Sequence, residues 1–141
     1  MTTPAPRLTL TLLDGGFAIC RLPADEPIPA WARRGALTSI TLTVDELSIV
    51  CAADDVPDHV NADPGWRALQ VAGPLPLDVP GVLAALAGPL ADAGIPIFAV
   101  STFDTDYLLV GSDRLDDTRA ALGAAGHTLS PGTDDDPKGS L

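Results

Sequence analysis

A short segment in the second half of the chain has the residue types of a helix N-terminus that could bind an anion. It reads Asp78-Val79-Pro80-Gly81-Val82-Leu83. Aspartate is a favoured capping residue, proline suits the first turn because its missing N–H has no helical partner there, and glycine leaves the backbone open to approach. The free N–H groups and positive dipole end of such a helix attract a carboxylate or phosphate. The pattern leaves open whether Asp78 contacts a ligand or only caps the helix.

A second group of polar side chains follows the next expected strand. Thr102, Phe103 and Asp106 lie at a strand end and turn, in the sequence STFDTDY. The Asp106 carboxylate and the Thr102 hydroxyl or carbonyl would accept hydrogen bonds from an ammonium group, and Phe103 would cover an apolar side of a ligand. Threonine and aspartate also occur in turns only to bond the backbone. Both interpretations stay open on these residues alone.

The residues that most often carry catalysis are few and scattered. Cys20 and Cys51 each lie in an apolar stretch without the spacing of a zinc site or a disulfide framework, so we expect buried reduced thiols. His59 falls in a loop and His127 at a strand start, where we expect surface or half-buried positions. The adjacent aspartates are expected to be solvated caps or a charged tail. We therefore expect no catalytic residue, no metal site and no cofactor.

The spacing of apolar residues predicts the elements that would hold these groups. Helices are expected over about residues 80–93 and 113–125, because apolar residues three and four apart share one face. Pro89 falls inside the first helix and should bend or break it. The runs at 96–100 and 107–110 are apolar on both faces, which predicts two central strands. The other expected strands cover residues 7–13, 17–22, 39–44, 47–51 and 127–130.

Composition narrows the class of protein and of partner. The chain has 141 residues, of which 46% are hydrophobic and 4% aromatic, which suits a sheet-and-helix core. A formal net charge of −11 disfavours nucleic acid as a partner, since that affinity comes mostly from cations that neutralise phosphates. No apolar run has the length that spans a bilayer, and the N-terminus lacks a signal-peptide core. We expect a cytoplasmic protein with no nucleic-acid or membrane partner.

These segments together resemble the ACT domain family, a group of small-molecule regulatory modules with βαββαβ order. The first strand-to-helix turn of that family typically reads D-x-P-G-[LIV]-[LIV], which is matched here by Asp78, Pro80, Gly81, Val82 and Leu83. A narrower resemblance, to the branch of aspartate kinase regulatory domains and the CASTOR arginine sensors, lies in residues 89–91, 94–95 and 101–107. The end of one ACT unit and the opening of the next are similar to residues 45–51 and 65–69. The resemblance implies an α+β fold of two ACT-like, ferredoxin-like units.

The two implied units are not equivalent. Residues 1–63 would form a degenerate N-terminal ACT-like unit and residues 64–130 a C-terminal ACT domain, followed by a disordered tail at 131–141. Pro23, Pro27 and Pro29 fall where the first unit would need its helix. Because such a segment cannot be helical, we expect strand and loop to replace the helix.

The resemblance implies a non-enzymatic regulatory sensor of a small molecule, most simply a free amino acid. Its pocket would form where two copies pair as a homodimer, and the two strands that are apolar on both faces favour such pairing because helices cover only one face. The alternatives are a regulatory subunit or an enzyme of an amino-acid pathway, and an interaction scaffold without a ligand. The residues expected to bind the ligand are Asp78, Gly81, Val82, Pro96, Ile97, Thr102, Phe103 and Asp106.

Overall fold

The structure is a computed structural model that describes residues 6–75 and 80–130. Those residues form an α+β fold whose eight strands belong to one sheet. The strands are β1 (Thr9–Leu12), β2 (Phe17–Leu22), β3 (Ser39–Leu42), β4 (Leu47–Ala52), β5 (Asn61–Val71), β6 (Phe98–Ser101), β7 (Asp106–Gly111) and β8 (Thr128–Ser130). The helices are α1 (Val82–Asp92) and α2 (Leu115–Ala124), and the short 3₁₀ turns are η1 (Ala30–Arg33), η2 (Ala53–Asp55) and η3 (Ser112–Arg114). The tail expected at 131–141 lies outside the described residues.

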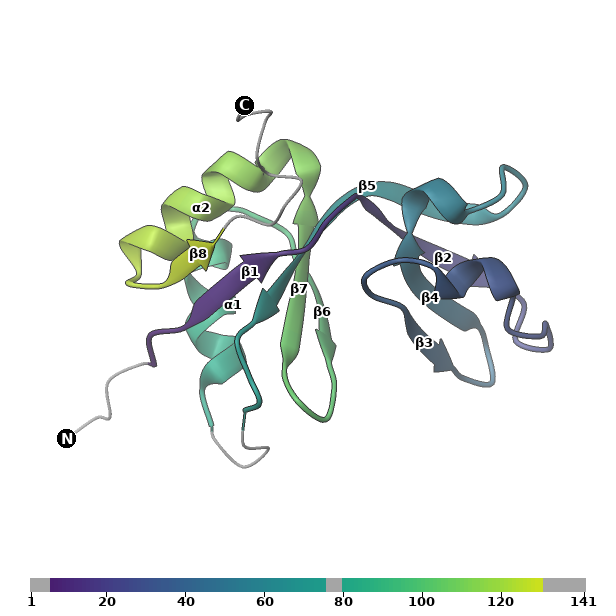
Figure 1. The fold of residues 1–141 in the computed structure, drawn as a ribbon, viewed down its shortest axis with the longest axis horizontal. Helices are drawn as coiled ribbons and strands as arrows, with labels where there is room; N and C mark the ends of the chain where they lie inside the picture. The colour runs from purple at the N-terminus through teal and green to yellow at the C-terminus, as the bar shows by residue number, and fades with distance from the viewer. Residues whose placement is uncertain (1–5, 76–79, 131–141) are drawn as a thin grey trace.

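Two units lie side by side and share the strand β5 (Figure 1). The N-terminal unit consists of β2, β3, β4 and residues 61–63 of β5, and the C-terminal unit of β1, β6, β7, β8, both helices and residues 66–71 of β5. Between these two parts of β5, Pro64 and Gly65 interrupt the register with β2, and Gly65 takes the left-handed φ of 91°. A bulge with such a glycine bends a strand. The domain boundary expected at residues 63–64 falls within β5.

The first strand lies in the C-terminal unit, between β5 and β8. It pairs antiparallel with β5 and parallel with β8. Leu10 and Leu12 on its buried side are 0% and 1% exposed, and they join the same core as Leu69 and Leu86. Residues 7–13 are thus not part of the first unit, where they are expected from their neighbours in sequence. Among residues 6–75 and 80–130, α-helices occur only in the C-terminal unit, and they cover the leucine side of β1.

Both helices cover one face of the C-terminal sheet. Leu86 and Leu90 of α1 and Leu122 of α2 pack on Leu108 and Val110 of β7. The helices expected at 80–93 and 113–125 are thus found, the second beginning with the 3₁₀ turn η3. Their three- and four-residue spacing of leucines is what buries one stripe of each helix against the sheet.

Pro89 lies inside α1 without ending it. Proline has no N–H to donate to the carbonyl four residues earlier, which is that of Ala85. The ring Nε2 of His127 lies 2.8 Å from this oxygen, and the Leu8 backbone N–H donates to Nδ1 at 3.1 Å. Because a carbonyl only accepts and a backbone N–H only donates, these partners assign a neutral ring protonated on Nε2. His127 is 6% exposed, so the expected surface or half-buried position is wrong.

The helix-free face of the C-terminal sheet packs against the N-terminal unit. Ala68, Val100 and Leu109 form one apolar cluster with Phe17 and Val50 of that unit. None of these residues is more than 8% exposed. The expected homodimer would bury the part of this face that the N-terminal unit leaves open, and these residues are not in that part because the N-terminal unit covers them.

The two strands expected to be central occupy different positions. β7 lies between β5 and β6, whereas β6 pairs with β7 alone among the described strands. The prediction is therefore confirmed for β7 and wrong for β6, which is an edge strand. Its apolar residues have another cause, because Phe98 and Val100 pack toward the N-terminal unit in place of a further strand.

The described part of the N-terminal unit contains 3₁₀ turns and no α-helix. Trp31 and Ala32 of η1 pack in a second core with Cys20, Ile49 and Cys51 on one face of β2 and β4. Loop and 3₁₀ structure thus replaces the helix, as the prolines at 23, 27 and 29 predict. The opposite face of this small sheet turns toward β6.

Candidate functional site

The turn between β6 and β7 is held together by two threonines. The Thr102 N–H donates to the Thr105 carbonyl at 2.9 Å, and the Thr102 hydroxyl donates to that carbonyl and accepts from the Thr105 N–H at 3.1 and 3.3 Å. The Thr105 hydroxyl is buried and donates to the Val71 carbonyl at 2.6 Å. Thr102 therefore fixes the turn, and Thr105, which sequence reasoning missed, ties the turn to the end of β5. Phe103 at the tip is 81% exposed.

The start of α1 lies at the same end of the sheet as this turn. The Leu75 N–H, shortly before α1, donates to the Asp104 carbonyl at 2.7 Å. Gly81 is the N-cap residue with a left-handed φ of 87°, and no side chain caps the first turn. Val82 is 7% exposed, so its side chain belongs to the core and only its backbone is available to a ligand. Asp78 lies outside the described residues, and its role stays a prediction.

Pro96 and Ile97 lie away from the other expected site residues in one copy of the chain. They precede β6, whereas Thr102 and Phe103 follow it, so the whole strand separates the two pairs. Pro96 is exposed, and Ile97 packs partly against the core under the helices. One chain thus brings Gly81 to the same end of the sheet as Thr102, Phe103 and Asp106, and leaves Pro96 and Ile97 at the other end.

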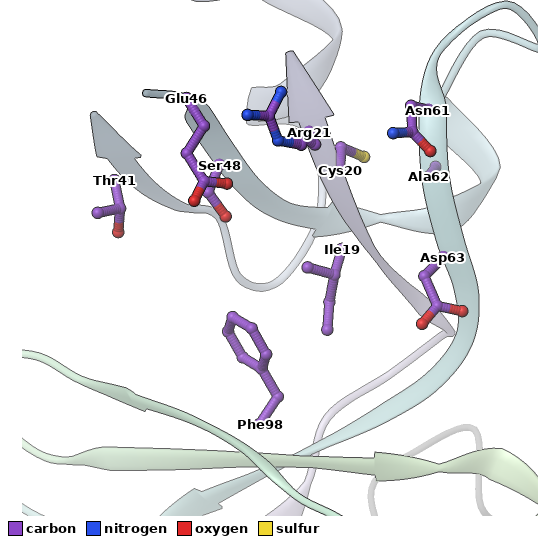
Figure 2. Close-up of a pocket in the computed structure, with 10 residues that line it drawn as sticks. All are labelled: Ile19, Cys20, Arg21, Thr41, Glu46, Ser48, Asn61, Ala62, Asp63 and Phe98. Atoms are coloured by element: carbon purple, nitrogen blue, oxygen red, sulfur yellow. The ribbon is translucent and has the colours of Figure 1, made fainter. Parts of the chain in front are cut away.

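A cleft that the sequence analysis missed lies between the two units. Its volume is about 450 Å³, and Figure 2 shows its lining side chains converging from the N-terminal sheet and from β6. The lining residues are Ile19, Cys20, Arg21, Thr41, Glu46, Ser48, Asn61, Ala62, Asp63 and Phe98. The signals that could have revealed it are the single charged residue of β2, Arg21, and the polar residues two apart at the start of β5, Asn61 and Asp63.

The two thiols are buried and stay protonated at neutral pH. Cys20 and Cys51 are buried, and burial raises the pKa of Cys20 and raises that of Cys51 to about 12. A thiol that stays protonated is a poor nucleophile. Among residues 6–75 and 80–130, no three His, Cys, Asp or Glu side chains gather as metal ligands would. No helix in this part of the chain is long and apolar enough to cross a membrane.

Comparison with protein families identifies the two units. The model of the ACT domain matches residues 61–123, and the model of a separate N-terminal domain matches residues 15–59. The first match spans β5, α1, β6, β7 and all of α2 except its last residue. Residues 61–123 belong to the ACT domain family.

Three individual proteins are similar to this chain. An Agrobacterium tumefaciens protein solved by X-ray crystallography is 48% identical, with a TM-score of 0.86 over 91% of this chain and 96% of that one. The human cytosolic arginine sensor for mTORC1 subunit 1 is 45% identical over 51 residues, which are 36% of this chain and only 16% of the sensor. The regulatory subunit of aspartate kinase from Thermus thermophilus shares the fold, with a TM-score of 0.55 at 14% identity over 80% of this chain and 93% of that one.

Proposed function

We propose that this ACT protein is a cytoplasmic regulatory sensor that binds a free amino acid and catalyses no reaction. The observation that carries the proposal is the ACT domain over residues 61–123 together with 45% identity, over 51 residues, to a protein named as an arginine sensor. The inert thiols, and the lack of a metal-ligand cluster in the described residues, fit binding better than catalysis.

The proposed site lies where α1 begins beside the β6–β7 turn. The uncapped first turn at Gly81 offers backbone N–H groups to an amino-acid carboxylate. The half-buried Asp106 carboxylate forms no ion pair with another described residue and is free to accept from an ammonium group. Phe103, 81% exposed, is available to cover an apolar part of the ligand.

A homodimer would complete this site. In the proposed arrangement, Pro96 and Ile97 of one copy face Gly81 and Val82 of the other. The edge strand β6 offers an unpaired row of backbone groups on which a second copy could assemble, and twofold pairing is the commonest form of self-association. A ligand held between copies would favour one assembly over another by its difference in affinity, which turns binding into a signal.

Calorimetric titration tests the placement of the site. Asp106→Asn should weaken a ligand that carries an ammonium group by about 1.5–3 kcal/mol, the usual contribution of a hydrogen bond to a charged group. The matched control is Asp104→Asn on the same turn, whose backbone carbonyl rather than side chain holds Leu75. Equal affinities of Asp106→Asn and the parent protein would place the ligand elsewhere.

Light scattering tests the assembly. The account expects twice the chain mass of 14.4 kDa when the ligand is present. A mass of one chain both with and without ligand would contradict the homodimer.

A further inference from the structure

The cleft between the units has the size and shape of a small-molecule site. Its volume of about 450 Å³ falls in the range of ligand pockets, roughly 300–1,000 Å³. One wall is the face of the N-terminal sheet opposite the Trp31 core, and the other is Phe98 at the start of β6. A ligand here would contact both units of one chain, and none of the lining residues belongs to the site proposed at α1.

A row of three polar side chains crosses the N-terminal sheet along the cleft (Figure 2). Arg21 of β2 lies directly opposite Ser48 of β4 on one side and Asn61 of β5 on the other. Directly opposed side chains on one face lie about 5 Å apart at Cβ. One Nη2–H of Arg21 donates to the Asp45 carbonyl at 3.0 Å, and a guanidinium has five N–H donors. The remaining donors, with the serine hydroxyl and asparagine amide, suit a carboxylate.

Two carboxylates flank this row on the same face. Glu46 precedes Ser48 by two residues, and Asp63 follows Asn61 by two, so each shares the face of its neighbour. Neither Glu46 nor Asp63 forms an ion pair within the described part of the chain. Together with the Arg21 guanidinium, the two carboxylates give the cleft a net charge of −1. A carboxylate that can bind a cation thus lies on each side of a guanidinium that can bind an anion.

Apolar surface completes the cleft. Ile19 of β2 projects from the floor, and Phe98 faces it from β6 (Figure 2). Both are half-buried and belong to the edge of the cluster that joins the units. Methylene groups of a ligand would pack between them, and the contact with Phe98 would link the ligand to the C-terminal unit.

We propose that this cleft binds a basic α-amino acid. In this arrangement Arg21, Ser48 and Asn61 hold the α-carboxylate, Asp63 and Glu46 hold the α-ammonium and the side-chain cation, and Ile19 and Phe98 contact the methylenes between. A neutral amino acid would leave one carboxylate unpaired, and an acidic amino acid or a phosphate would add negative charge to a site that already carries −1. The proposal draws on the proposed function only for amino acids as the ligand class.

Titration calorimetry with L-arginine and L-lysine tests this inference, with L-leucine and L-glutamate as ligands of the wrong charge. Glu46→Gln and Asp63→Asn should each weaken the basic amino acids by roughly 10- to 100-fold, the effect of losing a charged hydrogen bond. Their matched controls are Glu26→Gln and Asp58→Asn, which alter exposed carboxylates outside the cleft and should leave affinity within about twofold. Unchanged melting temperatures without ligand would show that all four variants are folded.

The outcomes separate the cleft from the site at α1. Weakened binding in the two cleft variants with unchanged binding in Asp106→Asn supports the cleft. Weakened binding in Asp106→Asn with unchanged binding in the cleft variants overturns the cleft and leaves the proposed function standing. Absence of heat with both basic amino acids, or equal affinity for L-leucine or L-glutamate, also overturns it.

Discussion

Replacing His127 should destabilise the protein, because its ring donates to the Ala85 carbonyl. The loss should depend on Pro89, which has no N–H to donate to that carbonyl. His127→Phe keeps the ring but removes the donor to the Ala85 carbonyl and the acceptor for the Leu8 N–H, at 2.8 and 3.1 Å in the parent protein. Each of the two part-buried backbone groups left without a partner costs about 1–3 kcal/mol, so the free energy of unfolding should fall by about 2–6 kcal/mol. The control His59→Phe alters an exposed histidine and should change it by less than about 0.5 kcal/mol.

Pro89→Ala tests the cause of that loss. Alanine restores the N–H that can donate to Ala85, so His127→Phe in this background should cost about 1–2 kcal/mol less than in the parent. The assay is urea unfolding followed by circular dichroism, with all four members of the cycle compared by linear extrapolation. Costs of His127→Phe that agree within about 0.3 kcal/mol in the two backgrounds would refute the idea that the ring replaces the missing helical bond.

Three further changes test the turn, the helix start and the thiols. Thr105→Val removes the buried hydroxyl that donates to Val71 and should lower the free energy of unfolding by about 1–2 kcal/mol in urea; an unchanged value would refute that bond. Gly81→Val should cost about 1–3 kcal/mol and Gly81→Asn less, because the φ of 87° disfavours valine although no atom lies within 4 Å of an added Cβ; equal melting temperatures would contradict this. Burial raises the pKa of Cys51 to about 12 from the ordinary 9.0, so the free energy of unfolding should be at its full value below pH 9.0 and fall as pH rises toward about 12. Iodoacetamide should label the thiols of the native protein far more slowly than those of the unfolded protein. Equal labelling rates would refute the burial of the thiols.

Much of the fold follows from local patterns in the sequence. The leucine spacing of α1 and α2 and the apolar runs of β2, β4 and β7 predict elements that the structure contains, because periodicity depends on which side of an element is buried. The placement of β1 and the edge position of β6 were not predicted. Both depend on packing between residues far apart in sequence, such as Leu10 with Leu86 within the C-terminal unit and Val100 with Phe17 between the units, which no local pattern encodes.

The candidate sites were predictable to different degrees. The D-x-P-G turn and the segment 101–107 led to Gly81, Thr102, Phe103 and Asp106, which the structure places at one end of the C-terminal sheet. The cleft was missed because Arg21 and Asp63 are distant in sequence and become neighbours only through the pairing of β2 with β5.

The central claim is that this ACT protein binds a free amino acid, and a thermal-shift panel of the standard amino acids tests it most directly. A ligand that binds only the folded state stabilises it by about 2.7 kcal/mol at a concentration 100 times its dissociation constant. The account predicts that one or two amino acids, with a basic one among them if the cleft is occupied, raise the melting temperature clearly above the rest. A melting temperature that no amino acid changes, even at millimolar concentration, would contradict it.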